Sequence, residues 1–332
     1  MRHVALIRAP AWIAAIALLT SAGAYAQSGA SAYPARPVHV VLPVPPGGLQ
    51  DALARAMAVE LSKRWSQAVV VENRAGGNGI VSGNAVAKAA ADGHTIWMGT
   101  VTQLSNDLVP GRSVPFDPAK DLVPVIALVE AGSVLVVRSD FAARNLRELI
   151  ALARSKPGEL NYGSFGVASL PHLDTVALGN IMNIKAVHVP YKGGAEIIQS
   201  LLSGQIAFSI MGITATLPQI QQGRLRALAY GGTRRSSSLP DVPTFPEAGV
   251  EGFTTGGWFG WFVPAGTPRP VIDRIAADAS RLITTPEFRD KYIHAAGLEV
   301  RNLPPDAFAE QLRRDREMFS SRLRALGSVK LD

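Results

Sequence analysis

The chain has 332 residues, of which 47% are hydrophobic and 18% are charged, and it contains no cysteine. A chain of this length can bury a sizeable core in one or two globular domains. The lack of cysteine excludes disulfides, thiolate metal sites and a cysteine nucleophile. The formal net charge of +7 is scattered over short basic pairs without interleaved aromatic residues, so nucleic-acid binding is not expected.

The N-terminus has the pattern of a secretory signal peptide. Arg2 and Arg8 form a basic start, Ala11–Leu19 is an apolar run, and an Ala-x-Ala cleavage signal ends at Ala26. The apolar run is shorter than the ~20 residues that a membrane-spanning helix needs, which makes a membrane anchor the weaker alternative. We therefore predict that residues 1–26 are a signal peptide, cleaved after Ala26, and that the mature protein is periplasmic.

Apolar runs of strand length alternate with helical patterns along the chain. The predicted strands are Val38–Leu42, Ala68–Val71, Thr95–Met98, Val123–Leu128, Val134–Val137, Leu160–Ser164, Ala186–Val189, Ile206–Met211, Leu225–Tyr230 and Trp258–Val263. The predicted helices are Ala52–Trp65, Val81–Ala91, Leu146–Ser155, one from Leu170, Ala195–Leu202 and Leu217–Gln222, followed by a mostly helical tail, Pro270–Leu326. This alternation indicates βαβ units and an α/β fold with parallel sheets.

The alternation comes in two batches, with an extended segment on each side of the second batch. This arrangement predicts two lobes between which the chain crosses twice, near 130–137 and 256–264. Lobe 1 is expected to comprise residues 33–132 and 255–332, and lobe 2 residues 133–254. In open α/β sheets a ligand binds in the crevice at the carboxyl ends of the strands, so we expect a cleft between the lobes.

A corner rich in proline and glycine, Pro45–Gly48, joins the first predicted strand to the first helix. A helix N-terminus presents unpaired N–H groups and a partial positive charge, so this corner could bind an anion. It lacks the Gly-Lys-Ser/Thr of a nucleotide-binding loop, and Asp51 is most simply the residue that caps the helix. From the residues alone, an anion site and a purely structural corner both remain open.

A second corner of the same kind follows the strand that ends at Ser164. A loop of small residues runs through Gly166 and Ala168, and a helix begins near Ser169. The two corners could face each other across the cleft and hold a carboxylate from both sides. Two further loops end strands at equivalent places, and they contain Thr100, Thr102, Met211 and Gly212.

Catalytic motifs are not evident. No serine lies in the G-x-S-x-G pattern of a hydrolase, and the run GGNGIVSG breaks the spacing of a dinucleotide-binding loop because Ser82 stands where the last glycine belongs. No pair of histidines has helical metal-ligand spacing. His172 could line the cleft, although a structural role is the simpler interpretation. We expect no catalytic residue, no metal and no cofactor.

Six motifs follow one another along the chain: YPARPVHVVLPVPPGGLQDALARAMA, VVVENRAGGNGIVSGNAVAKAAADGHTIWMGT, LNYGSFGVASLPHL, VHVPYKGGAE, LPDVPTFPEAGV and WFGWFVPAGTP. In order and spacing they resemble the receptors of tripartite tricarboxylate transporters, periplasmic solute-binding proteins also called the Bug family. The resemblance runs from Tyr33 to near the C-terminus. It implies a two-lobe, type II Venus-flytrap protein in which each lobe is a mixed, mostly parallel sheet flanked by helices.

The resemblance also implies what the protein binds and where. The ligand would be a small mono-, di- or aromatic carboxylic acid, and the partners the membrane permease subunits of the transporter, with the receptor a monomer. In the family, both corners clasp a ligand carboxylate, largely through backbone N–H groups and ordered water. The matching positions here are Pro46, Gly47, Gly48, Asp51, Thr100, Thr102, Ser164, Gly166, Ala168, Ser169 and His172.

One position departs from the family pattern. Members commonly have an acidic residue followed by Asn after the strand IAFSI, and here those positions are Met211 and Gly212. An Asp there could pair with an ammonium group, whereas Met offers soft apolar surface. If Met211 lines the pocket, the ligand is expected to be apolar or aromatic beyond its carboxylate, rather than an amino acid.

Two other functions remain open from the sequence. A ligand-sensing subunit would use the same closure to present its loaded form to a signalling partner, and neighbouring genes would distinguish it from a transport receptor. A periplasmic hydrolase or isomerase on the same fold would need a reactive residue in the cleft, and none of the expected motifs is present.

Overall fold

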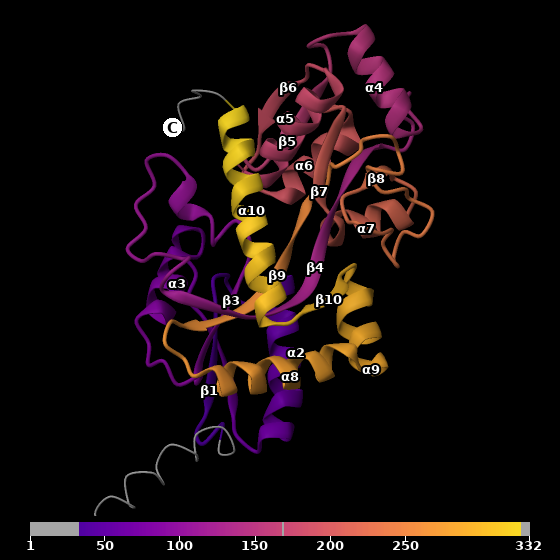
Figure 1. The fold of residues 1–332 in the computed structure, drawn as a ribbon. Coiled ribbons are helices and arrows are strands. Elements are labelled where there is room, and N and C mark those ends of the chain that lie inside the picture. Colours follow the sequence, from indigo (N-terminus) through magenta and orange to yellow (C-terminus); the bar gives the residue numbers. More distant parts are fainter. Residues whose placement is uncertain (1–32, 168, 327–332) are drawn as a thin grey trace, which may run out of the picture.

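The computed structural model describes residues 33–167 and 169–326, so the predicted signal peptide lies outside the described residues. Figure 1 shows two lobes with long strands running between them. The first elements are β1 (Val38–Leu42), α2 (Leu49–Trp65), β2 (Val69–Asn73), η1 (Gly77–Gly79), α3 (Ile80–Ala87), β3 (Thr95–Gly99), η2 (Asn106–Leu108) and the long β4 (Leu122–Arg138). In the described ranges, no helix is long and apolar enough to cross a membrane.

The remaining elements form the second lobe and the return to the first. The second lobe contains α4 (Leu146–Ser155), β5 (Asn161–Ser164), α5 (Leu170–Met182), β6 (Val187–Pro190), α6 (Gly194–Ser203), β7 (Phe208–Gly212), α7 (Ile213–Gln221) and β8 (Leu225–Tyr230). The chain returns through β9 (Gly256–Pro264) to α8 (Arg269–Thr284), α9 (Pro286–Phe288), η3 (Arg289–Ile293), η4 (His294–Ala296), β10 (Glu299–Leu303) and α10 (Pro305–Ala325).

Strand β4 takes part in both lobes. Its residues 122–132 pair with β9 and, in part, with β10, whereas residues 133–138 pair with β7 and β8. We call the body built on the first part lobe 1 and the body built on the second part lobe 2. The path through the sheet runs β2-β1-β3-β9-β4-β7-β5-β6, with β8 and β10 beside β4.

The sheet is mixed, as the family resemblance implies, whereas the alternation of strands and helices alone predicted parallel sheets. Its outer strands are the parallel ones. Strand β1 is parallel to β2 and β3, and β5 is parallel to β6 and β7. Every pairing that involves β4 or β9 is antiparallel. The two strands that cross between the lobes therefore run in opposite directions through the middle of the molecule.

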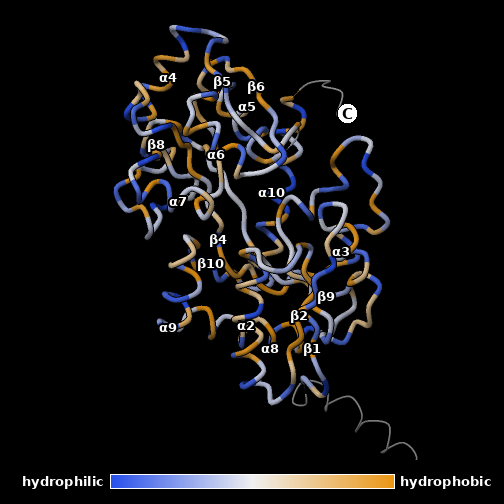
Figure 2. The backbone as a smooth tube through the Cα atoms, turned by 180° about the vertical axis from the view of Figure 1, so that it is seen from behind, coloured by the Kyte–Doolittle hydropathy of each residue, from blue (hydrophilic) through white to orange (hydrophobic). Residues whose placement is uncertain are grey.

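Each lobe has its own hydrophobic core because the helices bury one apolar face against the strands. In α2 the predicted face, which includes Met57, Leu61 and Trp65, is buried with β1 and α8. Lobe 2 packs α4 against β7 and β8. Figure 2 shows hydrophobic segments in both lobes, on helices as well as on strands.

The prediction of two separate strands at Val123–Leu128 and Val134–Val137 was wrong, because β4 is continuous. Residues 130–132 contain a glutamate and a glycine, which interrupt the apolar pattern. They stay extended because each pairs with a residue of β9 in the range 256–258.

The tail also contains a strand that the helical prediction omitted. Strand β10 pairs antiparallel with β4 through Glu299 and Val300, and then again at Leu303 after a shift in register. All five of its residues are partly buried. Because neither face of the strand is fully buried, its sequence shows no clear alternation of apolar and polar residues, and the pattern did not predict a strand. Elsewhere the differences are at element ends: for example, α7 begins at Ile213 rather than Leu217, because Gly212 is its N-cap.

Helix α10 belongs to the tail of lobe 1 but also reaches lobe 2. Phe319 of α10 packs with Leu173 of α5 in a small buried cluster. Next to it, the Arg322 guanidinium donates to the Asp174 carboxylate and, over 2.6 Å, to the Thr254 carbonyl. Thr255 also donates to Asp174, which is fully buried. Burial raises the pKa of Asp174 to about 6, even though Arg322 favours its ionised form.

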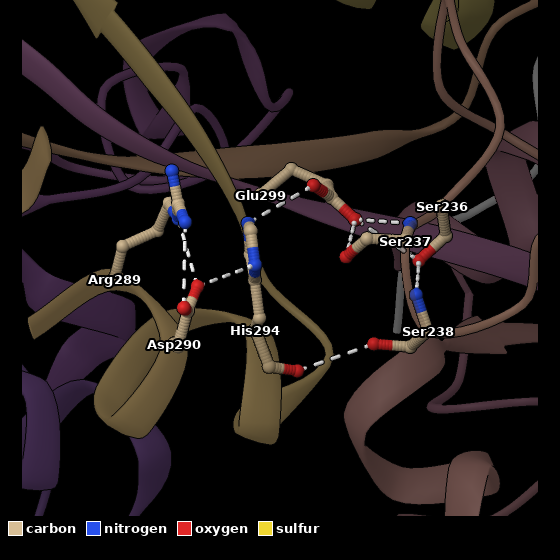
Figure 3. A network of polar contacts seen from close by, with 7 residues as sticks. All are labelled: Ser236, Ser237, Ser238, Arg289, Asp290, His294 and Glu299. Atoms are coloured by element: carbon tan, nitrogen blue, oxygen red, sulfur yellow. Dashed lines mark hydrogen bonds and ion pairs between the residues drawn. The ribbon is translucent and has the colours of Figure 1, made fainter. Parts of the chain in front are cut away.

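A polar network makes a second contact between the lobes (Figure 3). The carboxylate of Glu299 in lobe 1 accepts hydrogen bonds from the Ser236 hydroxyl, 3.2 Å away, and from the Ser237 amide and hydroxyl, 2.6 and 2.7 Å away. The Ser238 hydroxyl donates to the His294 carbonyl over 3.2 Å. The lobes are therefore joined at more than the two crossing strands.

The pair Asp174–Arg322 leads to a pH-dependent prediction. In Arg322→Met the buried carboxylate loses its cation, which should cost about 3–5 kcal/mol in the free energy of unfolding at pH 7.5. A carboxyl whose pKa is higher in the folded than in the unfolded state binds protons more tightly when folded, so stability falls as pH rises through that window. The loss should therefore be smaller at pH 5, where Asp174 is protonated, in urea unfolding at both pH values.

The double variant Asp174→Asn/Arg322→Met is the control for this measurement. It carries no buried carboxylate at this position, so its own free energy of unfolding should not show the fall between pH 5 and pH 7.5 that Asp174 gives to Arg322→Met. An equal loss for Arg322→Met at pH 5 and pH 7.5 would contradict the assignment of the effect to Asp174.

Candidate functional site

A cavity of about 500 Å³ lies between the two lobes. Lobe 1 contributes Thr102 and the turn residue Asn78, and the crossing strands contribute Ser133 and Gly257. Its other lining residues are Val109, Arg112, Ala131, Phe165, Val167, Ser169, Leu170, Pro171, Gly212 and Phe319. Both lobes, both crossing strands and α10 therefore meet at one cavity.

The lobe 1 corner, Pro45–Gly48, leads into the N-terminus of α2. Within the described residues, no side chain caps this helix end. Gly48 is the N-cap of α2 in an extended conformation, and Gly47 has φ of 92°, which only glycine adopts without strain. The Gly47 amide donates to the Asp51 carboxylate over 3.0 Å. The first amides of an α-helix have no partner within the helix, so this corner keeps donors for an anion.

The buried Asp51 carboxylate stabilises the corner through its hydrogen bond from the Gly47 amide. It is 3% exposed, accepts from Arg55 Nε over 2.9 Å, and accepts from Asn73 Nδ2 over 2.9 Å. The hydrogen bond from Arg55, together with those from Gly47 and Asn73, lowers the pKa of Asp51 to about 2. These contacts make Asp51 a residue that shapes the corner; it is not among the cavity-lining residues.

The corner and the loop after β3 lie at the same edge of the sheet, because β1 and β3 are parallel neighbours. The Thr100 and Thr102 hydroxyls are 3.1 Å apart, and the Thr100 amide donates to Gln103 Oε1. Thr102 lines the cavity, whereas Pro46, Gly47 and Gly48 are solvent-exposed outside its lining. In this conformation the first corner therefore stands apart from the residues that lobe 2 contributes.

The lobe 2 corner is held together by its serines. The Ser169 hydroxyl donates to the Gly166 carbonyl over 2.7 Å and contacts the Ser164 hydroxyl at 3.3 Å. Ser164 is fully buried and lies 2.6 Å from His188 Nε2. Ser169 is the N-cap of α5 and lines the cavity, whereas Ser164 supports the loop from below. Ala168 lies outside the described residues.

His172 lies behind this corner rather than in the cavity. Its ring stacks on His188 with the ring centres 4.0 Å apart, and it is 6% exposed. Burial, with a smaller contribution from His188, lowers the pKa of His172 to about 4. Burial also lowers the pKa of His188. Both rings are therefore neutral at physiological pH, which suits a structural stack beneath an anion site.

Met211 and Gly212 have different surroundings. Gly212 lines the cavity, but Met211 is fully buried in the core of lobe 2 with Ile197 and Leu201. Met211 pairs with Val134 of β4, and its side chain is directed into the packed interior. Met211 therefore does not line the cavity in this structure, which was the condition for its expected effect on ligand preference.

Several cavity residues were missed by the sequence analysis. Phe165 and Val167 lie in the predicted second corner and are 45% and 42% exposed, which is unusual for large apolar side chains. Asn78 lies in the GGNG turn with φ of 52°. Arg112 and Phe319 come from a surface turn and from α10, and neither has a local motif that would have identified it. No group of three or more His, Asp or Glu residues in the described ranges is placed to hold a metal.

The histidine stack gives a prediction about protonation. The His172 ring should titrate with a midpoint near pH 4 in NMR spectra of the folded protein, about two units below an exposed histidine. Because the unfolded chain then binds more protons than the folded one between these pH values, stability should fall as pH drops from about 6.5 to about 4. A His172 midpoint near 6.5 would contradict the buried stack.

The position of Met211 gives a second prediction. Met211→Leu conserves apolar volume in the core, so ligand affinity should stay within about twofold and stability within roughly 1.5 kcal/mol of the wild type. Met211→Asp buries a charge and should destabilise the fold instead of acting on the ligand. Calorimetric titration measures the effect on ligand affinity, and urea unfolding measures the effect on stability. A large change in affinity for Met211→Leu would indicate that Met211 contacts the ligand.

Comparison with known proteins identifies the family of this chain. Residues 53–317 match the model of the tripartite tricarboxylate transporter family receptor. Protein BugT of Bordetella pertussis is 36% identical over 259 residues, covering 76% of this chain and 78% of BugT.

Two solved structures of Rhodopseudomonas palustris proteins contain a bound carboxylate. Rpa4515 with adipate is 30% identical with a TM-score of 0.75, covering 89% of this chain and 98% of that one. MatC with bound malate is 28% identical with a TM-score of 0.70, covering 88% and 100%. The fold is that of the periplasmic binding proteins, and the family consists of solute-binding receptors, not enzymes. This chain belongs to the tripartite tricarboxylate transporter receptor family, the Bug proteins.

Proposed function

We propose that this protein is an extracytoplasmic receptor that captures a small carboxylate between its lobes and delivers it to the membrane permease subunits of a tripartite tricarboxylate transporter. The predicted signal peptide directs it to the periplasm. The observation that carries the proposal is the interlobe cavity, to which both lobes and both crossing strands contribute lining residues. The carboxylates bound by Rpa4515 and MatC support the same ligand class.

Closure of the lobes provides the mechanism. The moving bodies are residues 33–132 with 255–332 and residues 133–254, and the crossings near 130–137 and 256–264 act as the hinge. A ligand that contacts both lobes binds the closed form better and so shifts the population toward it. Closure would bring the exposed lobe 1 corner toward the lobe 2 corner, so that amides at Gly48 and around Ser169 hold one carboxylate. The permease then distinguishes the closed, loaded receptor from the open one.

The cavity lining restricts the ligand. Phe165, Val167 and Phe319 provide apolar surface, and none of the described residues that line the cavity is acidic. An amino acid would bring an ammonium group that finds no carboxylate partner there, at a considerable desolvation cost. A carboxylate with an apolar or aromatic body fits this lining better, which supports the ligand preference expected from the sequence, although through residues other than Met211.

Gly48→Val tests the role of the first corner. Gly48 has φ of −81°, and a Cβ there would meet no atom within 4 Å, so the fold should accept the valine. The side chain should block approach to the helix amides. Losing one hydrogen bond to a charged group costs about 1.5–3 kcal/mol, so carboxylate affinity should fall roughly tenfold to a hundredfold.

The measurement is calorimetric titration after a thermal-shift panel of mono-, di- and aromatic carboxylates. A bound ligand raises the melting temperature by mass action. Val59→Ala, at an exposed position on the same helix α2, is the matched control and should bind like the wild type. If the folded wild-type protein binds no carboxylate in the panel, the proposed receptor function is wrong. If Gly48→Val binds the carboxylate with wild-type affinity, the lobe 1 corner is not part of the binding site.

A further inference from the structure

We propose that Arg112 determines ligand specificity in the interlobe cavity and that the receptor therefore selects dicarboxylates over monocarboxylates of the same length. This inference rests on the proposed function and names the substrate class of that same site. One carboxylate would lie at the corners, the second would lie against the Arg112 guanidinium, and an apolar spacer would separate them.

The first observation is the charge of the lining. Of the described residues that line the cavity, Arg112 alone carries a charge. The neighbouring lining residues in lobe 2, such as Phe165 and Val167, are apolar, and the remaining polar ones are neutral. The cavity thus has one fixed positive charge and no negative charge to balance it, a composition suited to an anion.

The second observation is that this cation has no acidic partner. Over residues 33–167 and 169–326, no carboxylate lies within ion-pair distance of the Arg112 guanidinium; its Nη1 donates to the neutral Asn106 Oδ1 over 2.6 Å. The adjacent carboxylate, Asp107, is engaged by Arg316 over 2.6 and 2.8 Å. Arg322, in the last turn of α10, is paired with buried Asp174. Arg112 therefore keeps donors for a ligand.

The third observation is that a buried side chain, Asn106, holds the Arg112 guanidinium in place. Asn106 is 1% exposed, and its Nδ2 donates to the carbonyls of Asn78 and Gln103 over 2.9 and 3.0 Å. Asn78, which also lines the cavity, donates back to Asn106 Oδ1 over 3.0 Å. A buried amide thus holds one guanidinium nitrogen. The planar guanidinium can bind a carboxylate through two parallel hydrogen bonds, so holding it in place adds specificity as well as affinity.

The test compares adipate with hexanoate, which have six carbons each and differ in one carboxylate. In calorimetric titration, the wild type should bind adipate at least tenfold more tightly. Arg112→Gln should weaken adipate binding at least tenfold and leave hexanoate within about twofold. Arg112→Lys keeps the charge but lacks the two-pronged geometry, so it should recover only part of the preference. Terephthalate and 4-methylbenzoate repeat the comparison with a rigid aromatic spacer.

Arg144→Gln is the matched control, because it removes the same charge from an exposed position in lobe 2 and should leave both affinities unchanged. The melting temperature of each ligand-free variant verifies that it is folded. Equal effects of Arg112→Gln on adipate and hexanoate, or no effect on either, would overturn the inference while the proposed function stands, since carboxylates would still bind. Binding of neither ligand pair, nor of any other carboxylate, by the wild type would instead overturn the proposed function.

Discussion

The structure depends on one strand that is shared by two lobes. The 17 residues of β4 pair with β9 and β10 at one end and with β7 and β8 at the other. At the change of partner the backbones come close: a Cβ on Gly256, which has φ of 118°, would lie 2.9 Å from the Ala131 carbonyl oxygen and the Gly132 Cα. Only glycine fits there, so the crossing stays narrow. The same crossing supplies Ser133 and Gly257 to the cavity.

Helix α10 adds a second constraint on any movement between the lobes. It starts beside lobe 1, and its C-terminal half contacts α5 through Phe319 and the buried Arg322–Asp174 pair (Figure 1). Phe319 also lines the cavity. A rotation of the lobes must therefore keep these contacts or exchange them. Since breaking a buried ion pair is costly, we expect closure to keep the Arg322–Asp174 contact between the two moving bodies.

The distribution of charge separates structural from functional arginines. Arg322 and Arg316 meet carboxylates, and their charges are neutralised within the fold. Within residues 33–167 and 169–326, Arg112 contacts only the Asn106 amide oxygen, and it lies at the cavity. An anion entering from water would be attracted to this single uncompensated charge and then held by corner amides, which supply donors but no net charge. Affinity from the corners and selectivity from Arg112 would thus come from different parts of the chain.

Short-range patterns in the sequence account for most of the helices and strands. Helix α4 has the bounds that the sequence predicted, Leu146–Ser155. Its start is fixed locally, since Asn145 caps it by accepting from the Glu148 amide over 2.9 Å and an apolar face follows. Both corners were also identified, since proline, glycine and serine between a strand and a helix constrain the backbone directly. The α/β class followed from the same short-range patterns, and the resemblance carried by the family motifs implied a mixed sheet.

Which side chains reach the cavity depends on contacts between distant parts of the chain. Successive strand residues point to opposite faces, so Met211 is buried while Gly212 is open, and this depends on the pairing of β7 with β4. The continuity of β4 depends on its partner β9 in the same way. Arg112 and Phe319 are about two hundred residues apart in the chain. They share one cavity because α10 folds back across both lobes, a long-range contact that no local pattern encodes.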